Sequence, residues 1–361
     1  MNLVSLAIGM VLAALVIAMV VVRGAIAYAH RRGMMDLPGQ RRSHTLPTPR
    51  GGGIGVVVAV LLTVPACLLM LPGRLPFAVV AALAISTILV AAVGWWDDHA
   101  SLPVLPRFGI QLLSAGLLAV ALASAGMSWW WVPVLMLAGG WSINLHNFMD
   151  GIDGLLAQQV IFIGLGLALI AQAAIQPAMA VACACLAAAA AGFWYFNRPR
   201  ARIFMGDVGS GTMGLLIFAF TALLWQVDWH LIWPALILSS SFVADSSLTL
   251  LNRMVSGRRW YTAHREHLYQ WMVRSGFTHA TGGGVLSGLE HAGGGTARFP
   301  CMGLPDVGSA GVFRHLPDSD HRLDCHEAPV LVARREQGST CRYVNGSVSF
   351  IRERPWYSTT C

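Results

Sequence analysis

The chain contains 361 residues, of which 56% are hydrophobic and only 11% are charged. A soluble domain carries about a quarter charged residues, so this composition argues against a water-soluble globular protein. All 24 basic residues are arginine and 17 residues are acidic, which gives a net charge of +7. In a soluble protein this excess would suggest a nucleic-acid partner, but here the arginines lie between long apolar runs and indicate membrane topology.

Nine apolar segments follow one another from the N-terminus, and they predict an all-α polytopic membrane helical bundle. Most reach the roughly 20 residues that a helix needs to cross about 30 Å of hydrocarbon. Backbone polar groups cannot stay unpaired in lipid, so each segment should be helical. In chain order the segments are Leu3–Val22, Ile54–Leu71, Phe77–Trp96, Phe108–Met127, Trp129–Ile143, Leu155–Ile175, Ala178–Phe196, Thr212–Trp225 and Leu231–Leu251. The fifth and the eighth are short and need flanking residues to span.

The arginines predict the orientation of these segments. If the N-terminus lies on one side of the membrane, fifteen of the sixteen arginines before residue 280 fall on the other side, and Arg74 is the exception. Loops rich in arginine lie in the cytoplasm. The sequence therefore predicts an external N-terminus and cytoplasmic arginine-rich loops.

The last 80 or so residues differ from the rest of the chain. They lack long apolar runs, and they contain glycine clusters, four of the seven cysteines and eight of the 17 acidic residues. Because no periodicity indicates a folded core, we interpret this part as disordered or out of frame rather than as a soluble domain. We therefore divide the chain into a membrane domain, residues 1–280, and an atypical Gly- and Cys-rich tail, residues 281–361.

Acidic residues are rare in the membrane domain and gather in tight groups within the predicted cytoplasmic loops. Asp97 and Asp98 form a pair at the end of the third segment, where two carboxylates would share a cation or a proton. Asn147, Asp150 and Asp153 are spaced three apart in NLHNFMDGIDGLL, so a helical turn would place them on one side. Polar clusters at this depth in a membrane protein are costly and usually functional.

Two further groups combine charge with glycine or histidine. Asp207 follows three arginines and opens a glycine-rich helix start, which is a natural anion site. His264, Arg265 and His267 form a cationic cluster able to hold phosphate or sugar oxygens, and no further Cys or His nearby completes a zinc site. Carboxylates suit Mg²⁺, and arginine with histidine suits a phosphate-rich substrate. The four groups together predict phosphoryl transfer at the cytoplasmic membrane surface.

In order and in sequence, these loops resemble the polyprenyl-phosphate N-acetylhexosamine-1-phosphate transferases, the membrane family that includes phospho-N-acetylmuramoyl-pentapeptide transferase. The resemblance covers about residues 1–280 and depends on RRSHTLPTPRGGG, the Asp-Asp pair, NFMDGIDG, FMGDVGS and HREH. HREH is most similar to the branch that initiates O-antigen and other lipid-linked glycans, because the peptidoglycan branch typically shows three consecutive histidines. Family members continue past this loop with further membrane helices, whereas this chain enters the tail.

The resemblance implies an activity and a set of site residues. A polyprenyl phosphate would accept N-acetylhexosamine-1-phosphate from a UDP-sugar, with release of UMP and a requirement for Mg²⁺. The protein would lie in a bacterial inner membrane, where this lipid would be undecaprenyl phosphate. No nucleic acid takes part. Asp97 would activate the lipid phosphate beside Asp98, and Asp207 with Asn147 would bind Mg²⁺. The nucleotide and sugar would be held by Asn147, Asp150, Asp153, Phe204, His264, Arg265 and His267.

Several alternatives stay open at this stage. A peptidoglycan-type transferase differs from the main interpretation only in the donor. An ion-coupled transporter would place its carboxylates near the middle of the membrane and usually shows an internal repeat. A chain inactivated by its tail would keep the motifs without turnover. Asp245, inside the last segment, either matches an acidic position of some family members or pairs with Arg253.

Overall fold

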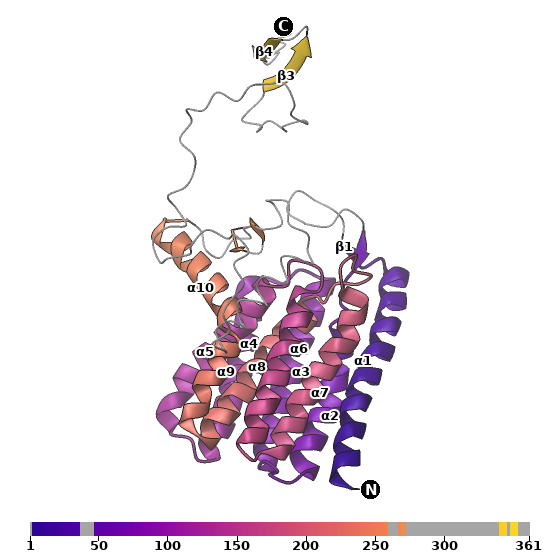
Figure 1. The fold of residues 1–361 in the computed structure, drawn as a ribbon. Coiled ribbons are helices and arrows are strands. Elements are labelled where there is room, and N and C mark those ends of the chain that lie inside the picture. Colours follow the sequence, from indigo (N-terminus) through magenta and orange to yellow (C-terminus); the bar gives the residue numbers. More distant parts are fainter. Residues whose placement is uncertain are drawn as a thin grey trace, which may run out of the picture. The chain divides into compact units, whose positions relative to one another are not determined.

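A computed structural model describes residues 2–36, 47–258, 266–268, 270–271, 339–344 and 347–352. The chain divides into two compact units, Met1–Phe299 and Pro300–Cys361. The described part of the first unit is a bundle of helices, as Figure 1 shows, which confirms the predicted all-α membrane fold. Its N-terminus lies at one end of the bundle, and strand β1 lies at the other end.

Ten α-helices make up the described bundle, with two short 3-10 turns and a two-residue strand pair. The helices are α1 (Leu3–Arg32), α2 (Ile54–Met70), α3 (Phe77–His99), α4 (Val104–Ser124), α5 (Val132–Phe148), α6 (Leu155–Ala173), α7 (Pro177–Asn197), α8 (Asp207–Val227), α9 (Ile232–Leu238) and α10 (Ser240–Val255). The 3-10 turns are Trp129–Trp131 and Trp229–Leu231. Strand β1 (Met35–Asp36) pairs antiparallel with β2 (Thr48–Pro49).

Six of the described helices are long and apolar enough to cross a membrane: α1, α3, α4, α6, α7 and α8. The bent pair formed by α9 and α10 would make a seventh, and α2 is a shorter apolar helix. The protein is therefore a multi-pass membrane protein. Each of the nine predicted segments corresponds to a helix or to this bent pair, but the described residues do not confirm nine complete spans.

Helix α1 shows how the bundle divides between lipid and protein contacts. Ile8, Leu12 and Val16 recur every fourth residue and are exposed, as expected for a face in contact with lipid. On the other side Ala18 is fully buried and packs against α7, where a Cβ at Gly192 would lie 3.0 Å from the Ala18 side chain. Small residues of this kind let membrane helices approach closely.

Helix α8 lies in the middle of the bundle, and nearly all of it is buried. It packs against both α3 and α5. The contact with α5 requires a glycine, because a Cβ at Gly214 would lie 2.5 Å from the Ser142 carbonyl oxygen. Helix α8 begins at Asp207, at one end of the bundle.

The last predicted segment is broken. Helix α9 ends at Leu238, α10 begins at Ser240, and the two axes differ by 74°. Three consecutive serines, residues 239–241, occupy the break, and serine side chains compete with helical backbone bonds. In Figure 1 α10 is inclined to the axes of the bundle helices.

The described part of the second unit is a β-hairpin. Strand β3 (Ser339–Val344) pairs antiparallel with β4 (Ser347–Arg352), with Ser339 opposite Arg352 and Val344 opposite Ser347. All other residues of the predicted tail lie outside the described residues, so the interpretation of the tail stays a prediction.

Candidate active site

Two glycine-rich segments, from the first loop and from the start of α8, pair at one end of the bundle. The Gly52 N–H donates to the Phe204 carbonyl over 2.9 Å, and the Gly53 N–H donates to the Met205 carbonyl over 2.8 Å. A Cβ at Gly53 would lie only 2.3 Å from the Gly209 Cα. The glycines of TPRGGG are therefore needed because another backbone passes against them.

Asp98 is buried beneath this junction and binds the start of α8. Its carboxylate accepts hydrogen bonds from the Asp207 N–H (3.1 Å) and the Val208 N–H (3.2 Å). The Arg50 guanidinium donates to the Asp98 carbonyl oxygen. Gly206, at a φ of +76°, leaves room for the carboxylate, since a Cβ there would lie 2.5 Å from Asp98 Oδ2. Asp98 thus acts as an N-cap supplied by another helix.

This arrangement corrects the expectation that the start of α8 is an open anion site. Two of its first N–H groups already bind the Asp98 carboxylate, and the Gly209 and Ser210 N–H groups donate to the Gly206 carbonyl. The anion at this helix terminus is a side chain of the protein.

A single arginine joins the other two catalytic candidates. One terminal nitrogen of Arg107 lies 2.6 Å from Asp97 Oδ2 and 2.9 Å from Asp207 Oδ2. The second Asp97 oxygen accepts the Leu102 N–H over 2.6 Å. All three charged side chains keep partial exposure, between 13% and 27%. The sequence did not predict Arg107 as a site residue, because this arginine served only to infer the orientation of the membrane helices. Its position ten residues after Asp97, at the start of α4, could have indicated the contact.

The group in NLHNFMDGIDGLL is arranged differently from the prediction. Helix α5 ends at Phe148, so Asn147 lies in its last turn while Asp150 and Asp153 lie in the following loop. Asp153 accepts the backbone N–H groups of Arg200 and Ala201, each over 3.1 Å. Its carboxylate therefore joins the loop after α5 to the loop after α7.

Asp150 lies near enough to other carboxylates for their charges to act on it. Burial raises the pKa of Asp150 well above its ordinary value, and the negative charges of Asp207, Asp98 and Asp153 raise it further. Acidic side chains from three parts of the chain are therefore close enough to repel one another here. A cation would offset that repulsion.

The donor set fits Mg²⁺ only as an incomplete shell. Among the described residues, no three His, Cys, Asp or Glu side chains gather closely enough to enclose a metal ion by themselves. Mg²⁺ in phosphoryl-transfer sites usually takes one or two carboxylates and completes its shell with water and substrate phosphates. Asp207 and its neighbour Asp150 would supply the one or two carboxylates. The Asn147 amide lies in the last turn of α5, three residues before Asp150.

Of the HREH motif, Glu266 and His267 are described and contact α10 and Phe148, whereas His264 and Arg265 lie outside the described residues. His267 is 2% exposed, and its ring stacks on Phe148 with centroids 6.3 Å apart and planes at 24°. Asp245 faces this loop, and Arg253 pairs with Glu266. The suggested pairing of Asp245 with Arg253 is therefore wrong, because each has its own partner in the loop.

Two of the three arginines that precede Asp207 contact an aromatic ring, and Phe204 lies in the same segment. The guanidinium groups of Arg198 and Arg202 lie 5.0 and 5.4 Å from the ring centroid of Tyr195, as cation–π contacts. Phe204 is half-buried and contributes its backbone to the junction described above, so its stacking role stays a prediction.

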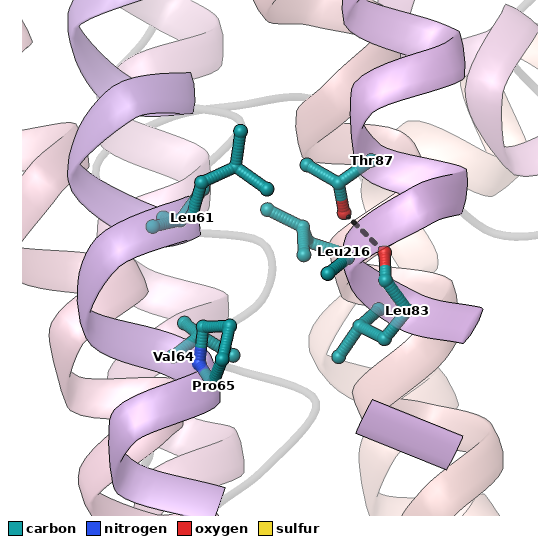
Figure 2. Close-up of a pocket in the computed structure, with 8 residues that line it drawn as sticks. Leu61, Val64, Pro65, Leu83, Thr87 and Leu216 are labelled. Carbon is teal, nitrogen blue, oxygen red and sulfur yellow. Dashed lines mark hydrogen bonds between the residues drawn. The ribbon is translucent and has the colours of Figure 1, made fainter. Parts of the chain in front are cut away.

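An apolar cavity lies between α2, α3 and α8, and its lining carries none of the candidate residues. It measures about 10 Å³ and is lined mainly by carbon, beside Pro65 in α2 (Figure 2). The Thr87 hydroxyl at its wall donates to the Leu83 carbonyl over 2.7 Å and has no need of a ligand. A small apolar space of this kind reflects packing around a proline rather than a substrate site.

Comparisons with known proteins show which sequences this chain resembles. The sequence profile of glycosyl transferase family 4 matches residues 80–225. A decaprenyl-phosphate N-acetylglucosaminephosphotransferase of Mycolicibacterium smegmatis is 28% identical across 70% of this chain and 71% of that protein. A phospho-N-acetylmuramoyl-pentapeptide-transferase of Synechococcus elongatus is 31% identical across 56% of this chain and 60% of that protein. The matched region contains Asp97, Asp98, Arg107 and Asp207, so the similarity to glycosyl transferase family 4 includes these residues.

Proposed function

We propose that the protein transfers an N-acetylhexosamine-1-phosphate from a UDP-sugar to a polyprenyl phosphate, releasing UMP and starting a lipid-linked glycan. The observation that carries this proposal is the Arg107 bridge between Asp97 and Asp207 beside the capped start of α8. It places acidic and cationic groups together at one end of a membrane bundle, where a phosphate of a lipid and a soluble nucleotide can meet. The family relationship supports the same reaction class.

The reaction requires one phosphorus–oxygen bond to form and another to break. An oxygen of the polyprenyl phosphate attacks the β-phosphorus of the UDP-sugar, and the bond from that phosphorus to the bridging oxygen breaks, so UMP leaves. Asp97 would accept any proton remaining on the lipid phosphate, and Arg107 would hold the phosphate oxygens by its fixed donors. Asp98 holds Asp207 in place through the backbone of α8.

Asp207 and Asn147 would hold Mg²⁺, which, when bound, supplies positive charge against the diphosphate oxygens. Asp150, Asp153 and Phe204 would border the nucleotide, and His264, Arg265 and His267 would bind the diphosphate or the sugar. We place the protein in the bacterial inner membrane, with the N-terminus outside and these loops in the cytoplasm.

The donor separates the main proposal from its closest alternative. The relative from Synechococcus favours a muramoyl-pentapeptide donor, whereas the mycolicibacterial relative favours N-acetylglucosamine. Both belong to one reaction class. The transporter alternative is not carried forward, since the family consists of transferases.

Transfer of label from UDP-N-acetylglucosamine to undecaprenyl phosphate tests the proposal, in membranes with and without Mg²⁺. Wild type is compared with Asp97→Asn and Asp207→Asn. Asp228→Asn is the matched control, because Asp228 is half-exposed in the loop that joins α8 to α9 and pairs with His230. We expect Mg²⁺-dependent product that is lost in the first two variants and kept in the third. Wild-type membranes that use neither this donor nor UDP-N-acetylmuramoyl-pentapeptide would contradict the proposal.

A further inference from the structure

We propose that Asp245 is a positioning residue that fixes the His267 ring for contact with the substrate diphosphate. This inference rests on the proposed function, and it concerns a residue of α10 outside the carboxylate group described above. It follows from the contacts between α10 and the HREH loop.

Helix α10 holds the loop at two places. Near its start, Asp245 Oδ1 accepts the Leu268 N–H over 2.8 Å and the Thr249 hydroxyl over 3.3 Å. Near its end, Arg253 and Arg258 both pair with Glu266. The side chains of Asp245 and Arg253 are only 5% and 8% exposed. Burying charges on a helix at the membrane boundary requires partners, and here the loop supplies them.

The same Asp245 oxygen faces the imidazole. His267 Nδ1 lies 3.8 Å from Asp245 Oδ1, which is ion-pair range but longer than a hydrogen bond. Contacts of this type often tighten only when substrate is bound. The other Asp245 oxygen, Oδ2, is buried and makes no hydrogen bond within the described part of the chain.

The ring of His267 is fixed from two directions. Phe148 stacks on its face, and Asp245 lies at its Nδ1 edge. When both ring nitrogens carry a proton, Nδ1–H can donate to the Asp245 carboxylate and Nε2–H can donate to a phosphate oxygen. Phe148 directly follows Asn147, so this ring is held beside the turn that carries the proposed Mg²⁺ and nucleotide contacts. Asp245 can thus set the orientation of a substrate-binding histidine and offset the positive charge of its doubly protonated ring.

Asp245→Asn separates positioning from loop docking. An asparagine keeps an oxygen for the Leu268 N–H but loses the negative charge at Nδ1, whereas Asp245→Ala loses both. An outer residue that orients a histidine typically contributes about 10- to 100-fold. We expect Asp245→Asn to keep the wild-type unfolding midpoint in the purified full chain and to lower kcat for transfer by that factor. Asp245→Ala should lower the midpoint as well.

Non-additivity gives the second readout. If Asp245 acts through His267, Asp245→Asn should have no further effect on kcat in a His267→Gln background. Asp228→Asn serves again as the control that leaves transfer unchanged. The inference is overturned if Asp245→Asn transfers at the wild-type rate, or if its effect multiplies with that of His267→Gln. Failure of the wild type to transfer from any UDP-N-acetyl sugar would instead refute the proposed function, and the inference with it.

Discussion

Gly94→Ala tests whether the packing of α3 against the start of α8 sets the position of Asp207. An added Cβ would lie 2.4 Å from the Asp207 carbonyl oxygen and 2.6 Å from the Val208 nitrogen, whereas an ordinary Cβ contact is at least 3.4 Å. Both obstacles are backbone atoms, so the segments must separate by about 1 Å. A displacement of about 1 Å at a reacting group can cost about 10²-fold in rate. We therefore expect kcat to fall by about 100-fold.

The stability of this variant should change much less than its activity. Overpacking costs about 1–3 kcal/mol. Replacing a glycine inside a helix by alanine contributes about 0.5–1 kcal/mol in the opposite direction. Gly24→Ala in α1 is the matched control, since no atom lies within 4 Å of a Cβ there. Transfer is measured beside thermal unfolding for both variants. A Gly94→Ala protein that transfers within threefold of Gly24→Ala would refute the reasoning.

Two further predictions concern charge. Arg107→Gln should lower the transfer rate at least about tenfold, because a neutral amide leaves Asp97 and Asp207 to repel each other. Arg107→Lys should recover part of the loss. Equal transfer rates in Arg107→Gln and wild type would contradict a role for the Arg107 bridge. The raised pKa of Asp150 means that it binds a proton at higher pH than an ordinary carboxyl group, and a cation favours the ionised form. The Mg²⁺ concentration for half-maximal transfer should therefore rise as pH falls toward that raised pKa, and Asp150→Asn should weaken this dependence.

The apolar helices were predictable because lipid leaves the backbone no other way to satisfy its hydrogen bonds. Phe77 was expected to start a helix and does start α3. Where a helix extends beyond its predicted end, polar residues continue it and form hydrogen bonds with residues elsewhere in the fold. Helix α5 extends past the predicted end at Ile143, and the Asn144 amide there donates to Gln111 in α4 over 2.8 Å. No local pattern indicates such a partner.

The start of α8 was predicted, but the group that caps it was not. The sequence predicted an apolar segment from Thr212, and it predicted that the glycine-rich residues after Asp207 open this helix. The helix begins at Asp207, because Asp98 of α3 binds its first N–H groups. A cap that comes from another helix leaves no signature in the neighbouring residues. The break at Ser239 was likewise missed, since the apolar pattern continues across it.

Asp97 and Asp98 show most clearly what adjacency in sequence conceals. The sequence suggested that the two carboxylates share a cation or a proton. Neighbouring residues on a helix point about 100° apart, however, so the two side chains can have different partners. Asp98 turns into the bundle, where it is 4% exposed and stabilises the start of α8. Asp97 stays partly exposed and meets Arg107. If these separate contacts define separate roles, Asp98→Asn should lower the unfolding midpoint along with transfer, whereas Asp97→Asn should affect transfer alone. Equal losses of stability in the two variants would show that the carboxylates act as one unit.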